Sequence, residues 1–270
     1  MIGRVTVVIG LALAASVWAA PLRAEAPSSG AAPAQAGPPA VISSLDLTGP
    51  FATRTPWRFV ATQGPKVPDP NFDGETAPGA VSLCLARPSG GACVAPLPNL
   101  TDAYWNAHNL DDARIVRAGA TPLLWLRTSS LPGANGDQAV LYQLLAYRRA
   151  ADRFEPVYAL QTGRNNNQDA RFVTRGPLAG AVISAEPTPN APFGFWVTVS
   201  RLSPGGGAFR PVLRYRSATR YGDGNPLAVI DSEMPNILQR LGLWLPGQPL
   251  PLPAGPCPKP RLVKGALWCG

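Results

Sequence analysis

The chain has 270 residues, of which 46% are hydrophobic and 15% are charged, and its formal net charge is +8. This length and apolar content suit one large domain with a buried core, or two small ones. No uncharged apolar run of about 18 residues follows the N-terminal stretch, which argues against an internal membrane span. The sequence also lacks a Lys/Arg block and a zinc-finger spacing, so we expect no nucleic-acid partner.

Residues 1–24 have the pattern of a secretory signal peptide. Arg4 supplies the positive charge, and an apolar stretch from Val5 to Ala20 follows it. We expect cleavage after Ala24, with an uncleaved N-terminal anchor as the alternative. A flexible leader rich in Ala, Pro, Ser and Gly is expected over 25–40, because it has little apolar surface to bury. The sequence therefore predicts a periplasmic or secreted protein.

The four cysteines support this expectation. Cys84, Cys93, Cys257 and Cys269 allow three pairings, and the local one, Cys84–Cys93 with Cys257–Cys269, fits best because each bond closes a short loop. A metal site would need close CxxC-type pairs, which are absent. Disulfides of this kind persist in oxidising compartments.

One β-repeat domain is expected over 41–245. Proline (32 residues) and glycine (27 residues) favour turns and short strands over long helices. Aromatic and β-branched residues bounded by turn residues indicate early strands. These strands are expected at 41–47, 57–62, 81–86 and 93–97.

A repeat follows the early strands. Asp112-Ala113-Arg114 recurs as Asp169-Ala170-Arg171, an offset of 57 residues, and the later matches share an offset of 55. We expect four strands in each unit, because apolar alternation and glycine turns recur at the same spacing. The expected strands are 114–117, 122–128, 139–148 and 154–161, then 171–175, 178–185, 193–202 and 209–216.

The spacing predicts an all-β fold, a propeller-like array of four-stranded repeats of about 55 residues. A duplicated β-sandwich is the alternative, because it gives similar strand spacing. One short helix is expected to begin at Pro235 and to stop at Gly242. Residues 246–270 contain seven prolines between Pro246 and Pro260, and we expect a disulfide-closed strap there.

No catalytic motif stands out. His108 is the only histidine, and it lies near Asp111 and Asp112. Together with Glu186 and Asp231, these residues are the candidates for a carboxylate-based hydrolase acting on a glycan or an ester. A nucleophilic mechanism is disfavoured because no Gly-x-Ser-x-Gly elbow is present.

The sequence indicates ligand-binding residues more strongly than catalytic ones. The run from Arg164 to Asp169 is the most polar in the chain, and such amide and acid side chains can grip hydroxyl, carboxylate or phosphate groups. An ordinary turn is the alternative interpretation. The predicted ligand-binding residues are Arg164, Asn165, Asn166, Asn167, Gln168, Asp169, Asp223 and Asn225.

The sequence predicts no cofactor and no bound metal. Turns with alternating oxygen ligands, at 135–137, 223–225 and 231–233, leave calcium as an alternative, although none completes a twelve-residue calcium loop. Tryptophans at 57, 105, 125 and 196 recur about once per unit, which is more typical of a core than of a sugar platform.

These observations predict an exported, non-catalytic binding or scaffold protein of a bacterial-type cell envelope. Its partner would be an envelope protein or a polysaccharide, and no integral membrane span is expected after signal removal. The alternative is the carboxylate-based envelope hydrolase.

Overall fold

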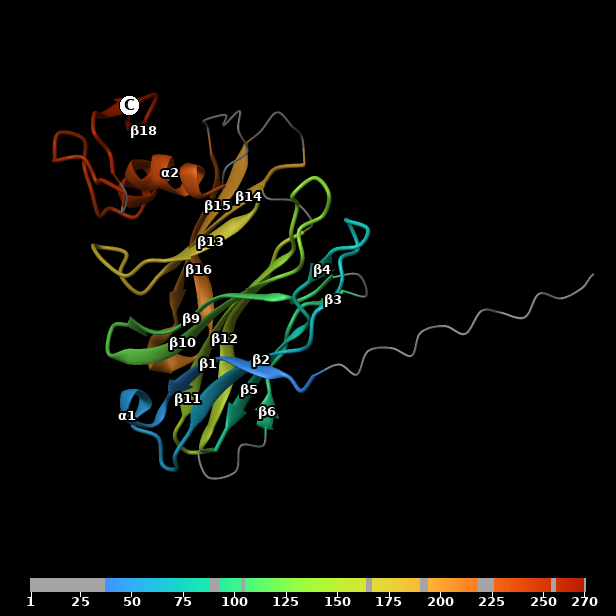
Figure 1. Ribbon diagram of the computed structural model, residues 1–270. Coiled ribbons are helices and arrows are strands. Elements are labelled where there is room, and N and C mark those ends of the chain that lie inside the picture. The colour runs from blue at the N-terminus through green and yellow to red at the C-terminus, as the bar shows by residue number, and fades with distance from the viewer. Residues whose placement is uncertain are drawn as a thin grey trace, which may run out of the picture. The chain divides into compact units, whose positions relative to one another are not determined.

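Three antiparallel four-stranded sheets form most of the described chain (Figure 1). The computed structural model describes residues 37–87, 93–102, 105–163, 167–189, 194–217, 226–253 and 256–269. The predicted signal peptide, 1–24, and most of the predicted leader lie outside these ranges. The described residues all belong to one unit, Ala36–Gly270.

In each sheet the strands follow one another in chain order. Sheet 1 consists of β1 (Ala40–Asp46), β2 (Arg58–Gln63), β5 (Val81–Ala86) and β6 (Cys93–Pro96). Sheet 2 consists of β9 (Asn109–Ala118), β10 (Thr121–Ser129), β11 (Val140–Arg148) and β12 (Arg153–Gln161). Sheet 3 consists of β13 (Asp169–Phe172), β14 (Val182–Pro187), β15 (Phe195–Leu202) and β16 (Phe209–Arg216).

The remaining elements are short, apart from one helix. The two-stranded ladders are β3 (Val67–Pro68) with β4 (Thr76–Ala77), β7 (Thr101–Asp102) with β8 (Trp105–Asn106), and β17 (Pro260–Val263) with β18 (Ala266–Cys269). The helices are α1 (Thr48–Phe51) and α2 (Pro226–Arg240), and a single 3₁₀ turn covers Pro204–Gly206.

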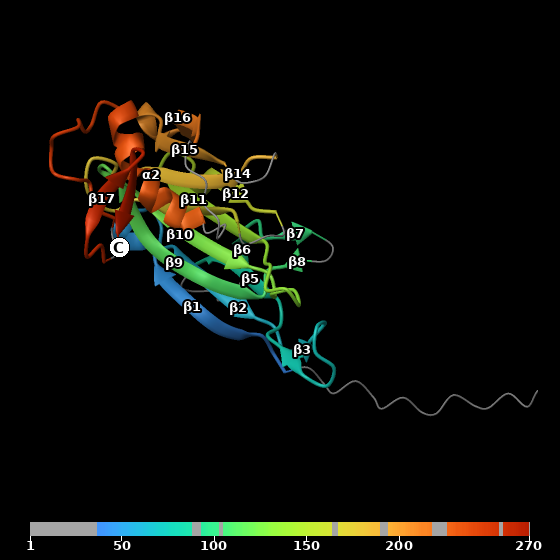
Figure 2. The same cartoon turned by 90° about the horizontal axis from the view of Figure 1, so that it is seen from above.

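Sheet 2 lies between the other two sheets, and Figure 2 shows the blue, green and yellow-orange strands in succession. Leu124 and Leu126 of β10 pack with Phe59 of sheet 1. Trp125, whose side chain points to the opposite face, packs with Phe172 of sheet 3. Alternation along β10 therefore buries both faces, and each fully buried leucine contributes roughly 1.5–3 kcal/mol.

Helix α2 covers the face of sheet 3 that does not meet sheet 2. Ile230 and Ile237 of α2 are fully buried against Ile183 on β14 and Val197 on β15. The helix was predicted to begin at Pro235, and this was wrong. It begins at Pro226, with Pro235 in its interior. Burial of the earlier residues on sheet 3 outweighs the hydrogen bond that an internal proline cannot make.

The β11–β12 turn is tied to the segment before β2. Asp152 adopts a left-handed backbone conformation with φ 45°. Its carboxylate accepts hydrogen bonds from Thr55 Oγ1 at 2.5 Å, Tyr147 Oη at 2.6 Å and Trp57 Nε1 at 3.1 Å. Arg87 forms an ion pair with the same carboxylate at 3.3 Å, and its guanidinium lies 3.7 Å above the Trp57 ring. Asp152 therefore clamps sheet 1 to sheet 2.

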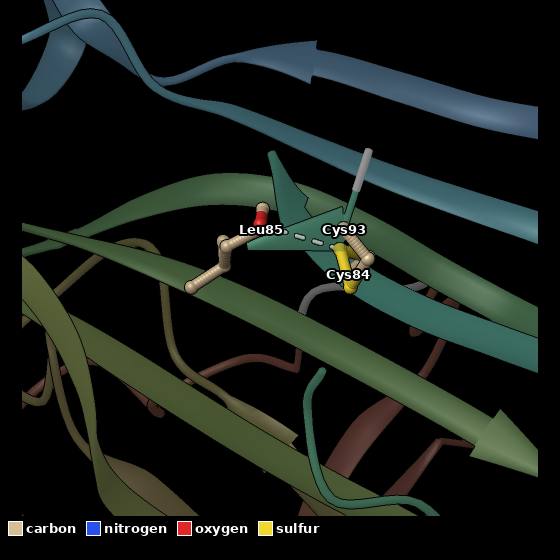
Figure 3. The surroundings of a disulfide bond; sticks show 3 residues. All are labelled: Cys84, Leu85 and Cys93. Atoms are coloured by element: carbon tan, nitrogen blue, oxygen red, sulfur yellow. Dashed lines mark hydrogen bonds between the residues drawn. A yellow bond between two sulfur atoms is a disulfide. The ribbon is translucent and has the colours of Figure 1, made fainter. Parts of the chain in front are cut away.

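Both predicted disulfides are confirmed. Cys84 on β5 is bonded to Cys93 on β6 (Figure 3), and Cys257 is bonded to Cys269 on β18. In Figure 3 the carbonyl oxygen of Leu85 lies beside the Cys84 sulfur, at 3.3 Å. The first bond crosslinks neighbouring strands and the second closes the C-terminal segment, as the local pairing required.

The prediction of a mostly β fold is confirmed, with antiparallel four-stranded sheets as its main units. Each of the two sequence units folds into one sheet, and their third strands begin at Val140 and Phe195, an offset of 55 residues. No strand ladder joins one sheet to the next within the described ranges, so the sheets form no closed barrel there. The described part of the chain does not show a closed propeller either.

Candidate functional site

A group of polar side chains joins sheet 2 to the first strand of sheet 3. The Tyr142 hydroxyl on β11 donates a hydrogen bond to the Asp169 carboxylate on β13. Arg127 Nε on β10 donates to the Tyr142 oxygen at 3.4 Å, and Arg127 Nη1 lies 3.8 Å from Asp111 Oδ2 on β9. Ser129 Oγ donates to Asp111 Oδ1 at 3.1 Å. We call these residues the polar cluster: Asp111, Arg127, Ser129, Tyr142 and Asp169.

Burial decides the proton affinities in the polar cluster. It raises the pKa of Asp111, while Arg127 and Ser129 act in the opposite direction. Burial also raises the pKa of Tyr142, and the negative charge of Asp169 adds to that effect. Tyr142 therefore keeps its proton at neutral pH and remains a hydrogen-bond donor.

The predicted ligand-binding residues are described only in part. Arg164, Asn165, Asn166, Asp223 and Asn225 lie outside the described residues. The other three are Asn167, Gln168 and Asp169, which directly precede or begin β13. Their positions bring the end of the polar run, 164–169, next to the polar cluster.

Hydrogen bonds hold the described end of this run, 167–169, in place. Gln168 Oε1 accepts a hydrogen bond from the Gly163 backbone N–H at 3.1 Å. Asp169 belongs to the polar cluster and also accepts from the Ala170 backbone N–H at 2.7 Å. The carbonyl oxygen of the Asn167 side chain is buried and has no hydrogen-bond partner among the described residues. An unpaired buried acceptor of this kind is costly unless another donor reaches it.

The predicted catalytic residues do not meet in one place. His108 Nδ1 donates to the Pro78 carbonyl oxygen at 2.7 Å, in a loop before β9. Asp112 forms an ion pair with Arg114 of the same strand at 3.3 Å. It is paired with Arg127 in the β9–β10 ladder, whose register shifts at Asp111.

The other two candidate carboxylates lie on sheet 3 and its helix. Glu186 on β14 lies close enough to Tyr158 for its charge to raise the pKa of that tyrosine, in addition to the larger effect of burial. Asp231 lies on α2, where it forms a two-pronged ion pair with Arg171 on β13. Among the predicted site residues that the structure describes, Asp111 and Asp169 come together around Arg127.

The prediction of a calcium-compatible turn at 231–233 was wrong, because these residues lie within α2. Glu233 is fully buried and accepts hydrogen bonds from Tyr215 at 2.8 Å, Ser217 at 2.9 Å and Asn236 at 3.0 Å. Within the described part of the chain, no three His, Cys, Asp or Glu side chains gather as a metal site would require.

The remaining calcium-compatible turns give little support to a metal. At 135–137 the Asn135 amide donates to the Asp137 carboxylate at 2.7 Å, so the turn closes on itself. The turn at 223–225 lies outside the described residues. Two of the recurring tryptophans, Trp57 and Trp125, are buried in the core, as the sequence favoured.

Sequence reasoning missed a cleft at the turn end of sheets 2 and 3. Its volume is about 320 Å³, and it is lined by residues 118–119, 121, 179–180 and 201–206. Arg201 is the charged residue of the lining. Its Nη2 donates to the Pro177 carbonyl oxygen at 3.0 Å, and its buried Nε has no partner in the part of the chain that the structure describes. The glycine-rich run at 205–207 indicated only a turn.

The polar cluster was also missed, although a signal existed. Arg127 and Tyr142 lie on strands that are mostly apolar on both faces, and buried Ser129 follows in the same strand as Arg127. A polar group in such a position needs a partner from another element. Nothing in the sequence alone identifies that partner as Asp169.

No helix in the described ranges has the length and hydropathy needed to span a membrane. No protein-family model, no curated protein and no solved structure matches the chain. What the chain does must therefore be argued from its own side chains.

Proposed function

We propose that the chain is an exported, non-catalytic binding or scaffold protein of a bacterial-type cell envelope. The observation that carries this proposal is the separation of the candidate catalytic residues. His108, Asp112 and Asp231 each have a different protein partner on a different element. A hydrolase needs its acids to converge on one pocket. Export is supported by the signal-like N-terminus and by two disulfides.

The proposed ligand surface is the polar run from Arg164 to Asp169, with Asp223 and Asn225. Support comes from its rigid base, because the polar cluster holds Asp169 and the Gly163 backbone holds Gln168. A polar loop on a fixed base loses less conformational entropy on binding than a free loop. The unpaired Asn167 oxygen offers an acceptor to a hydroxyl or amide donor. The expected partner is an envelope protein or a polysaccharide.

The proposed architecture is an open, propeller-like stack of three four-stranded units. The face-to-face packing of consecutive sheets supports it, because propeller blades pack in the same way. A duplicated sandwich would pair two sheets only, and sheet 2 is covered on both faces.

Site-specific crosslinking tests the ligand surface. A photo-reactive side chain at Gln168 should crosslink an envelope component in cells. The same group at Phe72, an exposed side chain in the turn between β3 and β4, is the matched control. Crosslinks at both positions, or at Phe72 alone, would contradict the proposal. Fractionation of the same cells checks export, since the crosslinked chain should be found outside the cytoplasm with both disulfides formed.

The alternative is a carboxylate-based envelope hydrolase, and one observation favours it. Asp111 and Asp169 both contact the Arg127–Tyr142 pair, and burial raises the pKa of Asp111, as a general acid requires. Purified D111N and D169N should then lose turnover of a glycan or ester panel, while D112N should keep it. No turnover by the wild-type chain on such a panel would leave the binding proposal in place.

A further inference from the structure

The C-terminal part of the chain is cationic throughout. No Asp or Glu follows Glu233, whereas Arg240, Lys259, Arg261 and Lys264 all do. Half of the formal net charge of +8 therefore comes from residues 234–270. A surface of one sign attracts partners of the opposite sign and repels its own copies.

Exposed apolar side chains gather in the same segment. Of the eleven large hydrophobic residues that are exposed in the described ranges, six lie after α2. They are Leu243, Leu245, Leu252, Leu262, Val263 and Trp268. Single exposed apolar residues are ordinary, but a concentration in one segment marks an interaction surface.

The β17–β18 hairpin gives this surface a defined geometry. Arg261 is directly opposite Trp268, and Val263 is two residues further along β17, so all three side chains lie on one face of the hairpin. Trp268 is 48% exposed and Val263 is 37% exposed. We call Arg261, Val263 and Trp268 the hairpin face. Lys264 stands at the turn and Lys259 immediately before β17.

The hairpin is anchored rather than loose. Ala266 and Leu267 are buried, and Leu267 lies on the face opposite Trp268. The turn lies against α2, because a Cβ added at Gly265 would be 3.1 Å from Asn236 Oδ1. The Cys257–Cys269 disulfide closes the base. The exposed side chains are therefore presented on a fixed support.

We propose that the hairpin face docks on the surface of an anionic phospholipid membrane. Tryptophan prefers the boundary between lipid headgroups and acyl chains, where its apolar ring and its N–H are both accommodated. The neighbouring cations Lys259, Arg261 and Lys264 complement anionic headgroups. A second copy of the chain is a poorer occupant, because a two-fold contact through this face would bring the same cations together. This inference does not depend on the ligand surface proposed above.

Vesicle binding tests the proposal. The assay uses the chain as exported by an expressing cell, with its N-terminus determined by mass spectrometry. It should bind vesicles of equal parts phosphatidylglycerol and phosphatidylcholine, and should bind pure phosphatidylcholine vesicles much less. Each cation near an anionic surface strengthens binding about five-fold, so R261Q/K264Q should weaken binding roughly 25-fold at low salt. The matched control R210Q/R214Q removes the same charge from β16, outside the hairpin face, and should stay close to the wild type.

A second pair of variants tests the apolar part. W268S should reduce binding, whereas V212S, at an exposed apolar position on β16, should not. Thermal unfolding of each variant shows whether the fold is retained. Equal losses in R261Q/K264Q and R210Q/R214Q would overturn the proposal, because general electrostatic attraction would explain the binding. Sedimentation of the chain without vesicles would also overturn it in favour of self-association.

Discussion

The hydroxyl of Tyr142 should stabilise the contact between sheets 2 and 3. Tyr142→Phe removes the hydrogen bond to Asp169 and the weaker contact with Arg127, while the ring contact with Trp125, at 5.7 Å, remains. A hydrogen bond to a charged group contributes about 1.5–3 kcal/mol. Asp169 and Arg127 are only half-buried, so water recovers part of this, and we expect a loss of about 1.5 kcal/mol in the free energy of unfolding. For a chain of this size the melting temperature should fall by roughly 3–6 °C.

Tyr158→Phe is the matched control. Tyr158 also lies on sheet 2 and packs against sheet 3, with its ring 5.8 Å from Phe209, but its hydroxyl makes no hydrogen bond with any described residue. Its replacement should change the free energy of unfolding by less than about 0.5 kcal/mol. Urea unfolding of both variants gives the comparison. Equal effects at the two positions would refute the reasoning, as would additivity of Tyr142→Phe with Asp169→Asn, because coupled residues are not additive.

Three further predictions concern stability. Hydrogen bonds, first of all from Thr55, hold the pKa of Asp152 below its ordinary 3.8. The Asp152 carboxylate therefore stabilises the folded state above that pH, and this stabilisation is lost as the pH falls. In D152N the melting temperature should fall less steeply as the pH is lowered. A steeper acid dependence in D152N would contradict this. Gly79→Ala would place a Cβ 2.1 Å from the Pro65 carbonyl oxygen and should destabilise by more than about 2 kcal/mol in chemical denaturation, and a neutral result would show that the loop can shift. Replacing Cys257 and Cys269 by serine should cost about 2–3 kcal/mol of local stability, seen as faster amide exchange in β17–β18 and not in sheet 2, whereas unchanged exchange would show that packing alone holds the hairpin.

Local patterns were sufficient to predict most strands of the three sheets, but not the short ladders β3–β4 and β7–β8 or the early start of β9 at Asn109. The third strand of the second unit was expected at 193–202 and runs from Phe195 to Leu202, because alternation of Phe195, Val197 and Val199 is readable from sequence. The local disulfides were predictable for a similar reason, since they join cysteines only 9 and 12 residues apart along the chain. Helix α2 was placed poorly, because Pro235 was interpreted as its first residue when Pro226 holds that position.

The polar cluster could not be predicted without the three-dimensional fold. Tyr142 and Asp169 lie 27 residues apart in sequence and on different sheets, so no window along the chain contains both. Asp111 was selected because it lies near His108, yet its partners are Arg127 and Ser129 on the neighbouring strand. Contacts of this kind depend on how the sheets stack. The alternation of apolar and polar residues along a strand shows which residues share a face, but not which residues of another sheet they meet.

Helix α2 has a consequence for how the chain assembles. Each sheet of the stack offers an apolar face to the next, and Ile183, Val197 and Val199 on sheet 3 would offer one more. Because α2 occupies that face, it covers the end of the stack, as capping repeats cover the ends of solenoid proteins. A chain that ended before Pro226 would carry an open end, and copies of it would be expected to join one another at that face.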